Sequence, residues 1–250
     1  MEIYQKSCEV LRYNKLTDTV HDVWVNAPDI AEKALPGQFV NIMVPGFFLR
    51  RPISICEVEK TNIRLVFEER GEGTRVLGGI KPGDNLDVLG PLGNSGFSVD
   101  RYSSAILVGG GIGTPPLKFA QQNLEKSAAV LGFRSKANVI MAEEFRNATV
   151  CTDDGSFGFH GNTLRPLERL LLERVFDVIM ACGPKPMLRA VVALADKYNI
   201  PSEISLEERM ACGAGACLGC ACKTVADSIV SYPRVCKDGP VFDGKAAVLC

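Results

Sequence analysis

The distribution of apolar and polar positions changes once along the chain. Over residues 1–100, short apolar segments rich in Val, Ile, Leu and Phe alternate with turn sequences such as Pro36-Gly37 and Lys81-Pro82-Gly83-Asp84. Short strands at this spacing predict an antiparallel barrel or sandwich. One short helix is expected after Gly71. The predicted strands cover residues 3–13, 19–26, 38–44, 50–58, 63–69 and 84–89.

From residue 101 onward, short apolar strands alternate with helical segments. This pattern predicts a parallel sheet covered by helices on both faces, followed by a cysteine-rich tail from residue 207. We therefore expect three parts, with boundaries at 1–100, 101–206 and 207–250. Strands are expected at 105–108, 129–133, 148–152, 177–180 and 202–206, and helices at 114–126, 137–145, 163–173 and 185–198.

Composition excludes several classes of protein. The chain is 46% hydrophobic and 23% charged, which is typical of a packed globular protein. Its net charge of −1 gives no basic excess for nucleic acid. No run of 18 apolar residues predicts a transmembrane helix, and the first residues lack the pattern of a signal peptide. The cytoplasm is the expected location.

The cysteines carry the strongest chemical signal. The chain has ten cysteines and two histidines, and six of the cysteines fall in the last 40 positions. The pattern C-x4-C-x2-C with a distant fourth cysteine is typical of a plant-type [2Fe–2S] cluster. Gly213 and Gly215 between the first two cysteines allow the backbone to approach the cluster closely. The predicted cluster ligands are Cys212, Cys217, Cys220 and Cys236.

Other interpretations of these cysteines remain open. Four thiolates also suit structural zinc, although zinc ribbons more often carry two C-x2-C pairs. A Rieske centre is excluded because the segment has no histidine. Cys222 is expected to be a spare buried thiol, and the terminal Cys250 has no assigned role. The scattered Cys8, Cys56, Cys151 and Cys182 are expected to be small buried apolar residues.

Two loops predict a dinucleotide site. Glycines between a strand and a helix let a pyrophosphate approach the helix N-terminus, although the pattern departs from G-x-G-x-x-G and also suits a plain tight turn. A second loop ends the strand at 177–180, where its backbone could lie beside a nicotinamide or simply start a helix. The candidate residues are Gly109, Gly110, Gly111, Gly113 and Thr114 in the first loop, and Cys182, Gly183 and Pro184 in the second.

The choice between NAD and NADP stays open at this stage. Arg134-Ser135 follows the second strand, where the adenosine ribose would lie, and an arginine there suits a 2′-phosphate. Glu143 or Glu144 would instead favour NAD through the ribose hydroxyl.

Four sequence elements carry a family resemblance. They are Arg50-Arg51-Pro52-Ile53-Ser54, Gly71-Glu72-Gly73-Thr74, the block from Met210 to Cys220, and the block from Arg234 to Phe242. The order of barrel, nucleotide domain and cluster segment resembles the ferredoxin–NADP reductase superfamily. The cysteine blocks are closely similar to the electron-transfer subunits of class 1B dihydroorotate dehydrogenase, and the resemblance covers essentially the whole chain.

The resemblance implies an antiparallel Greek-key barrel that binds FAD, a parallel-sheet domain that binds NAD(H), and a [2Fe–2S] tail. Arg51 would neutralise the FAD pyrophosphate, Ser54 would lie near the isoalloxazine, and Cys182 would lie beside the nicotinamide or flavin. The gap from Cys220 to Cys236 is shorter than in plant ferredoxins, so we expect a loop-and-hairpin appendage. The remaining implied FAD contacts are Pro52, Ile53, Val66, Phe67, Glu68, Gly73 and Thr74.

The resemblance also implies an activity. The chain would be an NAD-linked iron–sulfur flavoprotein subunit in pyrimidine biosynthesis. It would relay electrons to NAD+ from an FMN-containing catalytic subunit that oxidises dihydroorotate to orotate, in a heterotetramer with two copies of each chain. The cofactors would do the chemistry, without a catalytic acid or base. The alternatives are an NAD(P)H-dependent diaphorase subunit of a sulfide dehydrogenase or hydrogenase, and a redox-sensing or zinc-stabilised binding module.

Overall fold

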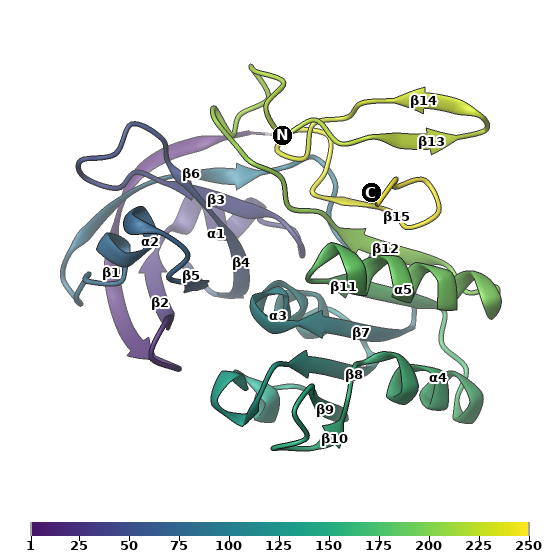
Figure 1. Cartoon of the computed structure of the whole chain (residues 1–250). Helices are drawn as coiled ribbons and strands as arrows, with labels where there is room; N and C mark the ends of the chain where they lie inside the picture. The colour runs from purple at the N-terminus through teal and green to yellow at the C-terminus, as the bar shows by residue number, and fades with distance from the viewer. Residues whose placement is uncertain (1, 250) are drawn as a thin grey trace.

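The N-terminal strands form a closed barrel in the computed structural model, which describes residues 2–249 (Figure 1). The strand order is β1-β2-β5-β4-β3-β6, and every pair is antiparallel. Two short helices, α1 (Pro28–Lys33) and α2 (Glu72–Leu77), lie in the connections. The strands are β1 (Tyr4–Lys15), β2 (Val20–Asn26), β3 (Phe39–Ile42), β4 (Arg51–Glu59), β5 (Asn62–Glu68) and β6 (Asn85–Leu92).

A seven-stranded sheet follows, in the order β10-β9-β8-β7-β11-β12-β15. All neighbours are parallel except β12 and β15, which are antiparallel. Its strands are β7 (Ser104–Gly110), β8 (Lys126–Phe133), β9 (Ala148–Thr152), β10 (Phe159–His160), β11 (Val178–Cys182), β12 (Ser202–Ser205) and β15 (Val241–Asp243). An antiparallel barrel followed by a parallel α/β sheet is the predicted fold class, which is confirmed.

Helices cover both faces of this sheet. Successive residues of a strand point to opposite faces, so each strand contributes side chains to the core on either side. On β7, Ala105 and Leu107 pack in the core that contains α3 (Thr114–Gln122). The residues between them, Ile106 and Val108, pack in the core that contains α4 (Leu164–Glu173) and α5 (Lys185–Lys197). The continuous apolar runs of these strands follow from burial on both sides.

Two predicted helices differ from the structure. The helix expected at 137–145 is replaced by two 3₁₀ turns, η2 (Lys136–Asn138) and η3 (Ala142–Glu144), because Met141 between them has a left-handed backbone with φ 55°. Burial of Ile140, Met141 and Phe145 in the sheet core supports this irregular path. The helix expected at 114–126 ends at Gln122, and β8 already begins at Lys126.

The last part of the chain, residues 207–249, is here called the cysteine segment. It contains a hairpin of β13 (Thr224–Ala226) and β14 (Ile229–Ser231), which projects from the molecule, and strand β15, which returns to the edge of the large sheet (Figure 1). The expected loop-and-hairpin appendage is present. No helix within residues 2–249 is long and apolar enough to cross a membrane.

The barrel and the sheet are joined by a buried cation. Arg64 on β5 pairs with Asp22 on β2 at 2.8 Å and with Glu144 of η3 at 3.0 Å. Burial disfavours the charged guanidinium, but the hydrogen bonds of both carboxylates outweigh it and raise the pKa of Arg64. A buried charge is retained only when it is paired in this way, so the network fixes the two parts relative to one another.

Candidate cofactor sites

An open cavity of about 860 Å³ lies where the barrel, the sheet and the cysteine segment meet; it is called the flavin cavity below. Six of the predicted FAD contacts line it from β4 and β5, and Thr74 of α2 is a seventh. Residues after β12 also line it: Met210, which begins the cysteine block named above, and Glu207 and Glu208, which the sequence did not single out. The seven predicted lining residues are Pro52, Ile53, Ser54, Val66, Phe67, Glu68 and Thr74.

Arg51 and Gly73 do not line the flavin cavity themselves but lie against each other beside it. A Cβ on Gly73 would be 2.2 Å from Arg51 Nε, so a side chain at residue 73 would displace the guanidinium. The guanidinium also lies 4.8 Å from the centre of the Phe47 ring. The Thr74 hydroxyl accepts from Arg70 N at 2.9 Å and so holds the turn. A cation beside a bare backbone is suited to a phosphate group.

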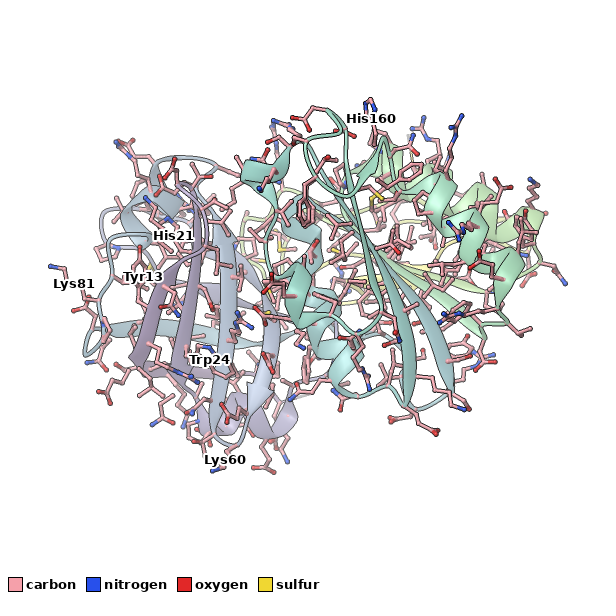
Figure 2. All side chains as sticks on the ribbon, turned by 90° about the horizontal axis from the view of Figure 1, so that it is seen from below. Tyr13, His21, Trp24, Lys60, Lys81 and His160 are labelled. Carbon is pink, nitrogen blue, oxygen red and sulfur yellow. The ribbon has the colours of Figure 1, made fainter. Side chains whose placement is uncertain are left out.

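The same cavity wall has a buried support that sequence reasoning missed. His21, which lies beside Tyr13 in Figure 2, contacts the Tyr13 hydroxyl through Nδ1 at 2.8 Å. Its Nε2 contacts Glu69 Oε1, also at 2.8 Å. Its ring stacks on Phe67, with 5.2 Å between ring centres. All residues of β2 from Val20 to Val25 are buried, so no alternation along the strand singles out His21, and its partners lie on other parts of the chain. His160, by contrast, is exposed.

A second cavity of about 1380 Å³ adjoins the first and shares Glu68, Arg70 and Ile112 with it. The two predicted nucleotide loops meet at this second cavity, called the nucleotide cavity below. A Cβ on Gly183 would be 3.0 Å from Gly110 Cα, and one on Gly110 would be 2.7 Å from Met187 Sδ. Three of the predicted residues line the nucleotide cavity: Gly110, Gly111 and Pro184.

The other residues of these loops support the turn from behind. A Cβ on Gly113 would be 2.3 Å from the carbonyl oxygen of Cys182, and one on Gly109 would be 2.8 Å from Thr114 Oγ1. Cys182 is buried and lines neither cavity. Burial raises the pKa of its thiol, so the side chain is neutral at neutral pH.

Of the alternatives left open for the ribose, the structure places the arginine and not the glutamates at the nucleotide cavity. Neither Glu143 nor Glu144 lines the nucleotide cavity, and Glu144 is instead bound to Arg64 of the barrel. Arg134 does line it, at the end of β8, and Asp153 lines it at the end of the adjacent β9. The signal for Asp153 was its place after a parallel strand, because ligands bind beyond the carboxyl ends of such strands.

The cluster cysteines lie close together in two pairs. Cys217 N donates to Cys212 Sγ at 3.4 Å, and Cys236 N donates to Cys220 Sγ at 3.4 Å. Gly215 N donates to Cys236 Sγ at 3.2 Å, so the glycine-rich turn spans both pairs. Burial raises the pKa of the Cys212 thiol, but the backbone N–H groups around it have the larger combined effect and lower it to about 6.

The arrangement of the four cysteines bears on the metal they would hold. Among residues 2–249, no group of three or more His, Cys, Asp or Glu side chains is already arranged around a single metal ion. A two-iron cluster instead takes two thiolates on each iron, which suits Cys212 with Cys217 and Cys220 with Cys236. Cys222 points elsewhere, with its Sγ 3.5 Å from Pro233 O. The four scattered cysteines are buried and free, as expected, and Cys250 lies outside the described residues.

Comparison with known proteins decides the family. Residues 207–247 match the family described as the iron–sulfur cluster binding domain of dihydroorotate dehydrogenase B. The electron transfer subunit of dihydroorotate dehydrogenase B (NAD(+)) from Bacillus caldolyticus is 43% identical over 94% of this chain and 95% of that protein. The subunit of the same name from Enterococcus faecalis is 38% identical over 100% of both.

The chain belongs to the family of dihydroorotate dehydrogenase B electron transfer subunits. Among solved structures, a chain of the NADH-dependent reduced ferredoxin–NADP oxidoreductase, described for flavin-based electron bifurcation, has a TM-score of 0.86. It is 32% identical, with coverage of 97% of this chain and 90% of that one. The ferredoxin reductase of carbazole 1,9a-dioxygenase shares the fold, with a TM-score of 0.68, 20% identity, and coverage of 80% and 68%.

Proposed function

We propose that this member of the family relays electrons between an FMN-containing dihydroorotate dehydrogenase subunit and NAD+. The observation that carries the proposal is the position of the flavin cavity. It adjoins the nucleotide cavity on one side, and its wall includes Phe39 and Met210, which pack in the same core as Cys220 and Cys236. One bound flavin would therefore lie between a nicotinamide and the cluster, which a two-step relay needs.

The proposed cofactors are FAD, NAD(H) and a [2Fe–2S] cluster. A flavin exchanges hydride with a nicotinamide and single electrons with an iron–sulfur cluster. The chain's own residues bind and orient: Arg51 and Thr74 hold the flavin phosphates, Ser54 and Phe67 border the ring, and the loops at Gly110 and Gly183 hold the nicotinamide nucleotide. The cluster ligands are Cys212, Cys217, Cys220 and Cys236, and the three parts of the chain carry one cofactor each.

The reaction balances without a catalytic acid or base on this chain. Dihydroorotate gives up two electrons and two protons in forming orotate. NAD+ takes two electrons and one proton, and the second proton is released to water. Because the substrate is oxidised on the partner, this chain moves electrons only. We propose a cytoplasmic heterotetramer with two copies of each chain.

A second candidate is supported by one comparison. The chain is also 32% identical over 97% of its length to a chain of the NADH-dependent reduced ferredoxin–NADP oxidoreductase. A diaphorase subunit of another redox enzyme, of sulfide dehydrogenase or hydrogenase type, would use the same cavities and differ in its partner. The cysteine segment matches the dihydroorotate dehydrogenase B family, which favours the first proposal.

The test is to isolate the native complex anaerobically through a tag on this chain. Dihydroorotate-driven NAD+ reduction is then followed by the absorbance of NADH. Activity that disappears in Cys217→Ser supports both the partner and the cluster relay. Absence of activity, with a different flavoprotein in the complex, would overturn the dihydroorotate proposal in favour of the second candidate.

A further inference from the structure

Strand β3 connects the flavin cavity to the cysteine segment. Its side chains alternate, as in any strand. Val40 and Ile42 point into the barrel core. Phe39 points outward, lines the flavin cavity, and packs in the core that contains two of the cluster cysteines. Asn41 therefore shares this outward face, between the two proposed cofactor sites.

Asn41 lies beside residues of both the flavin cavity and the cysteine segment. Within the sheet it lies opposite Pro52, which lines the flavin cavity, and paired residues of an antiparallel ladder point to the same face. Toward the cysteine segment it meets Gly213, where a Cβ would be 2.1 Å from Asn41 Nδ2. Gly213 follows the cluster ligand Cys212 directly and has φ 66°, which favours glycine.

The amide of Asn41 is buried at a cost. The residue is 1% exposed, and its Oδ1 has no hydrogen-bond partner among residues 2–249. Arg50 donates to the backbone oxygen of Asn41 at 3.1 Å, so it does not satisfy the side chain. A buried acceptor without a partner costs about 1–3 kcal/mol. A leucine of similar size would fill the same space without that cost, so packing alone does not account for the amide.

We infer that Asn41 is a positioning residue for electron transfer between the flavin and the cluster. Its amide fixes the turn at Gly213, and with it Cys212, against the strand that borders the flavin cavity. Its free carbonyl oxygen accepts a hydrogen bond from a donor that is present when the cofactors are bound. This inference rests on the proposed function and adds the residue that sets the geometry between its two redox groups.

The test compares Asn41→Leu with Val40→Ala in the cofactor-loaded protein. Val40 is the adjacent residue of β3 but points into the barrel, so its truncation perturbs packing without touching Gly213. Three quantities are measured: the EPR spectrum of the reduced cluster, its reduction potential, and the rate of flavin-to-cluster electron transfer after NADH addition.

We expect Asn41→Leu to slow internal transfer several-fold and to change the EPR spectrum and the reduction potential of the cluster. Val40→Ala should lower the melting temperature and leave the three quantities unchanged. An Asn41→Leu protein with a wild-type EPR spectrum, potential and transfer rate would overturn the inference. If wild-type protein binds no flavin or no cluster, the proposed function itself fails, which is a separate outcome.

A second pair of variants covers poor folding of Asn41→Leu. Gly213→Ala places a methyl group against the Asn41 amide and should change the EPR spectrum of the cluster. Asn41→Ser removes the obstructing amide, so in the double variant the added effect of Gly213→Ala should shrink. Strictly additive effects of the two substitutions would show that residues 41 and 213 do not act together, and would contradict the inference.

Discussion

The two large sheets and the cysteine segment reach their folds by different means. In the barrel and the parallel sheet, apolar side chains fill cores between ladders of backbone hydrogen bonds, and residues such as Ile55 and Ile179 are fully buried. The cysteine segment has one short hairpin of its own, and its buried Val235, Cys220 and Cys236 pack in a core shared with the sheet. Such a segment depends on its neighbours and on the metal it binds.

The attachment of the cysteine segment shows this dependence. Asn94 N donates to Lys237 O at 2.8 Å, and Ser95 N donates to Gly239 O at 3.0 Å, so the turn after β6 holds the cluster loop. A Cβ on Gly93 would be 2.4 Å from Gly239 O, so the two backbones are in direct contact. Arg234 then anchors the glycine-rich turn by donating to Gly215 O at 2.7 Å. The difference between the cysteine segment and the two large sheets implies that loss of the cluster unfolds the cysteine segment and leaves the rest of the fold in place.

The largest effect is expected from Cys220→Ser. If Cys220 is one of the proposed cluster ligands, its loss should release the cluster and expose the cysteine segment to proteolysis, while the barrel and strands β7 to β12 stay folded. Visible absorption, iron content and limited proteolysis measure this. Cys222→Ser is the matched control, because it removes a nearby buried thiol that lies outside both cysteine pairs. Equal loss of iron in both variants would contradict the ligand assignment.

The next effect lies within the parallel sheet. In Gly113→Ala the new methyl group would lie 2.3 Å from the carbonyl oxygen of Cys182, which forces the two nucleotide loops apart. Overpacking of this kind costs about 1–3 kcal/mol, so NADH affinity should fall by roughly tenfold or more. The cluster should be retained, because the damage lies in the parallel sheet. Gly79→Ala is the control, because the nearest atom to its new Cβ would be Val76 O at 3.3 Å. Unchanged NADH affinity in Gly113→Ala would count against the site.

A comparable effect is expected in the barrel from Arg51→Ala. If Arg51 binds the flavin pyrophosphate, its loss removes charge-assisted hydrogen bonds worth about 1.5–3 kcal/mol, so FAD affinity should fall about tenfold or more. Fluorescence of released flavin on dilution measures the affinity. Arg75→Ala removes an exposed arginine of nearby α2 that pairs with Glu72, and should leave FAD affinity unchanged. Equal FAD loss in both variants would argue against a specific role for Arg51.

The sequence was sufficient where its signals are local. The apolar strand patterns predicted the two sheets, which are confirmed. The glycine loops and the cysteine spacing gave the candidate nucleotide and cluster residues, which stay predictions. The sequence could not predict contacts across the fold, such as Arg64 with Glu144, because ion pairing depends on how the barrel and the sheet meet. The irregular path around Met141 was missed for a similar reason: the burial of Ile140 and Phe145 in the core accompanies it, and local helix propensity does not report that.

The smallest effect is expected from Asp177→Asn, at the residue that directly precedes strand β11 of the parallel sheet. The Ser104 N–H donates to Asp177 Oδ2 at 2.8 Å, and the Ser103 N–H donates to the same oxygen. These hydrogen bonds lower the pKa of Asp177. A carboxylate with a lowered pKa in the folded state stabilises above its unfolded pKa, and that contribution is lost as pH falls through the folded pKa. The variant should be slightly less stable than wild type at pH 7, and this deficit should shrink as the pH falls through the folded pKa. Thermal unfolding at pH 7 and at acidic pH checks this, and an equal deficit at both would contradict it.

The most direct measurement is the flow of electrons through this chain alone. NADH is added anaerobically to the cofactor-loaded protein, and flavin absorbance and the EPR signal of the reduced cluster are followed together. The account predicts flavin bleaching and then a cluster signal in wild type, and bleaching without a signal in Cys217→Ser. Protein that holds both flavin and cluster but shows no cluster reduction after NADH addition would contradict it.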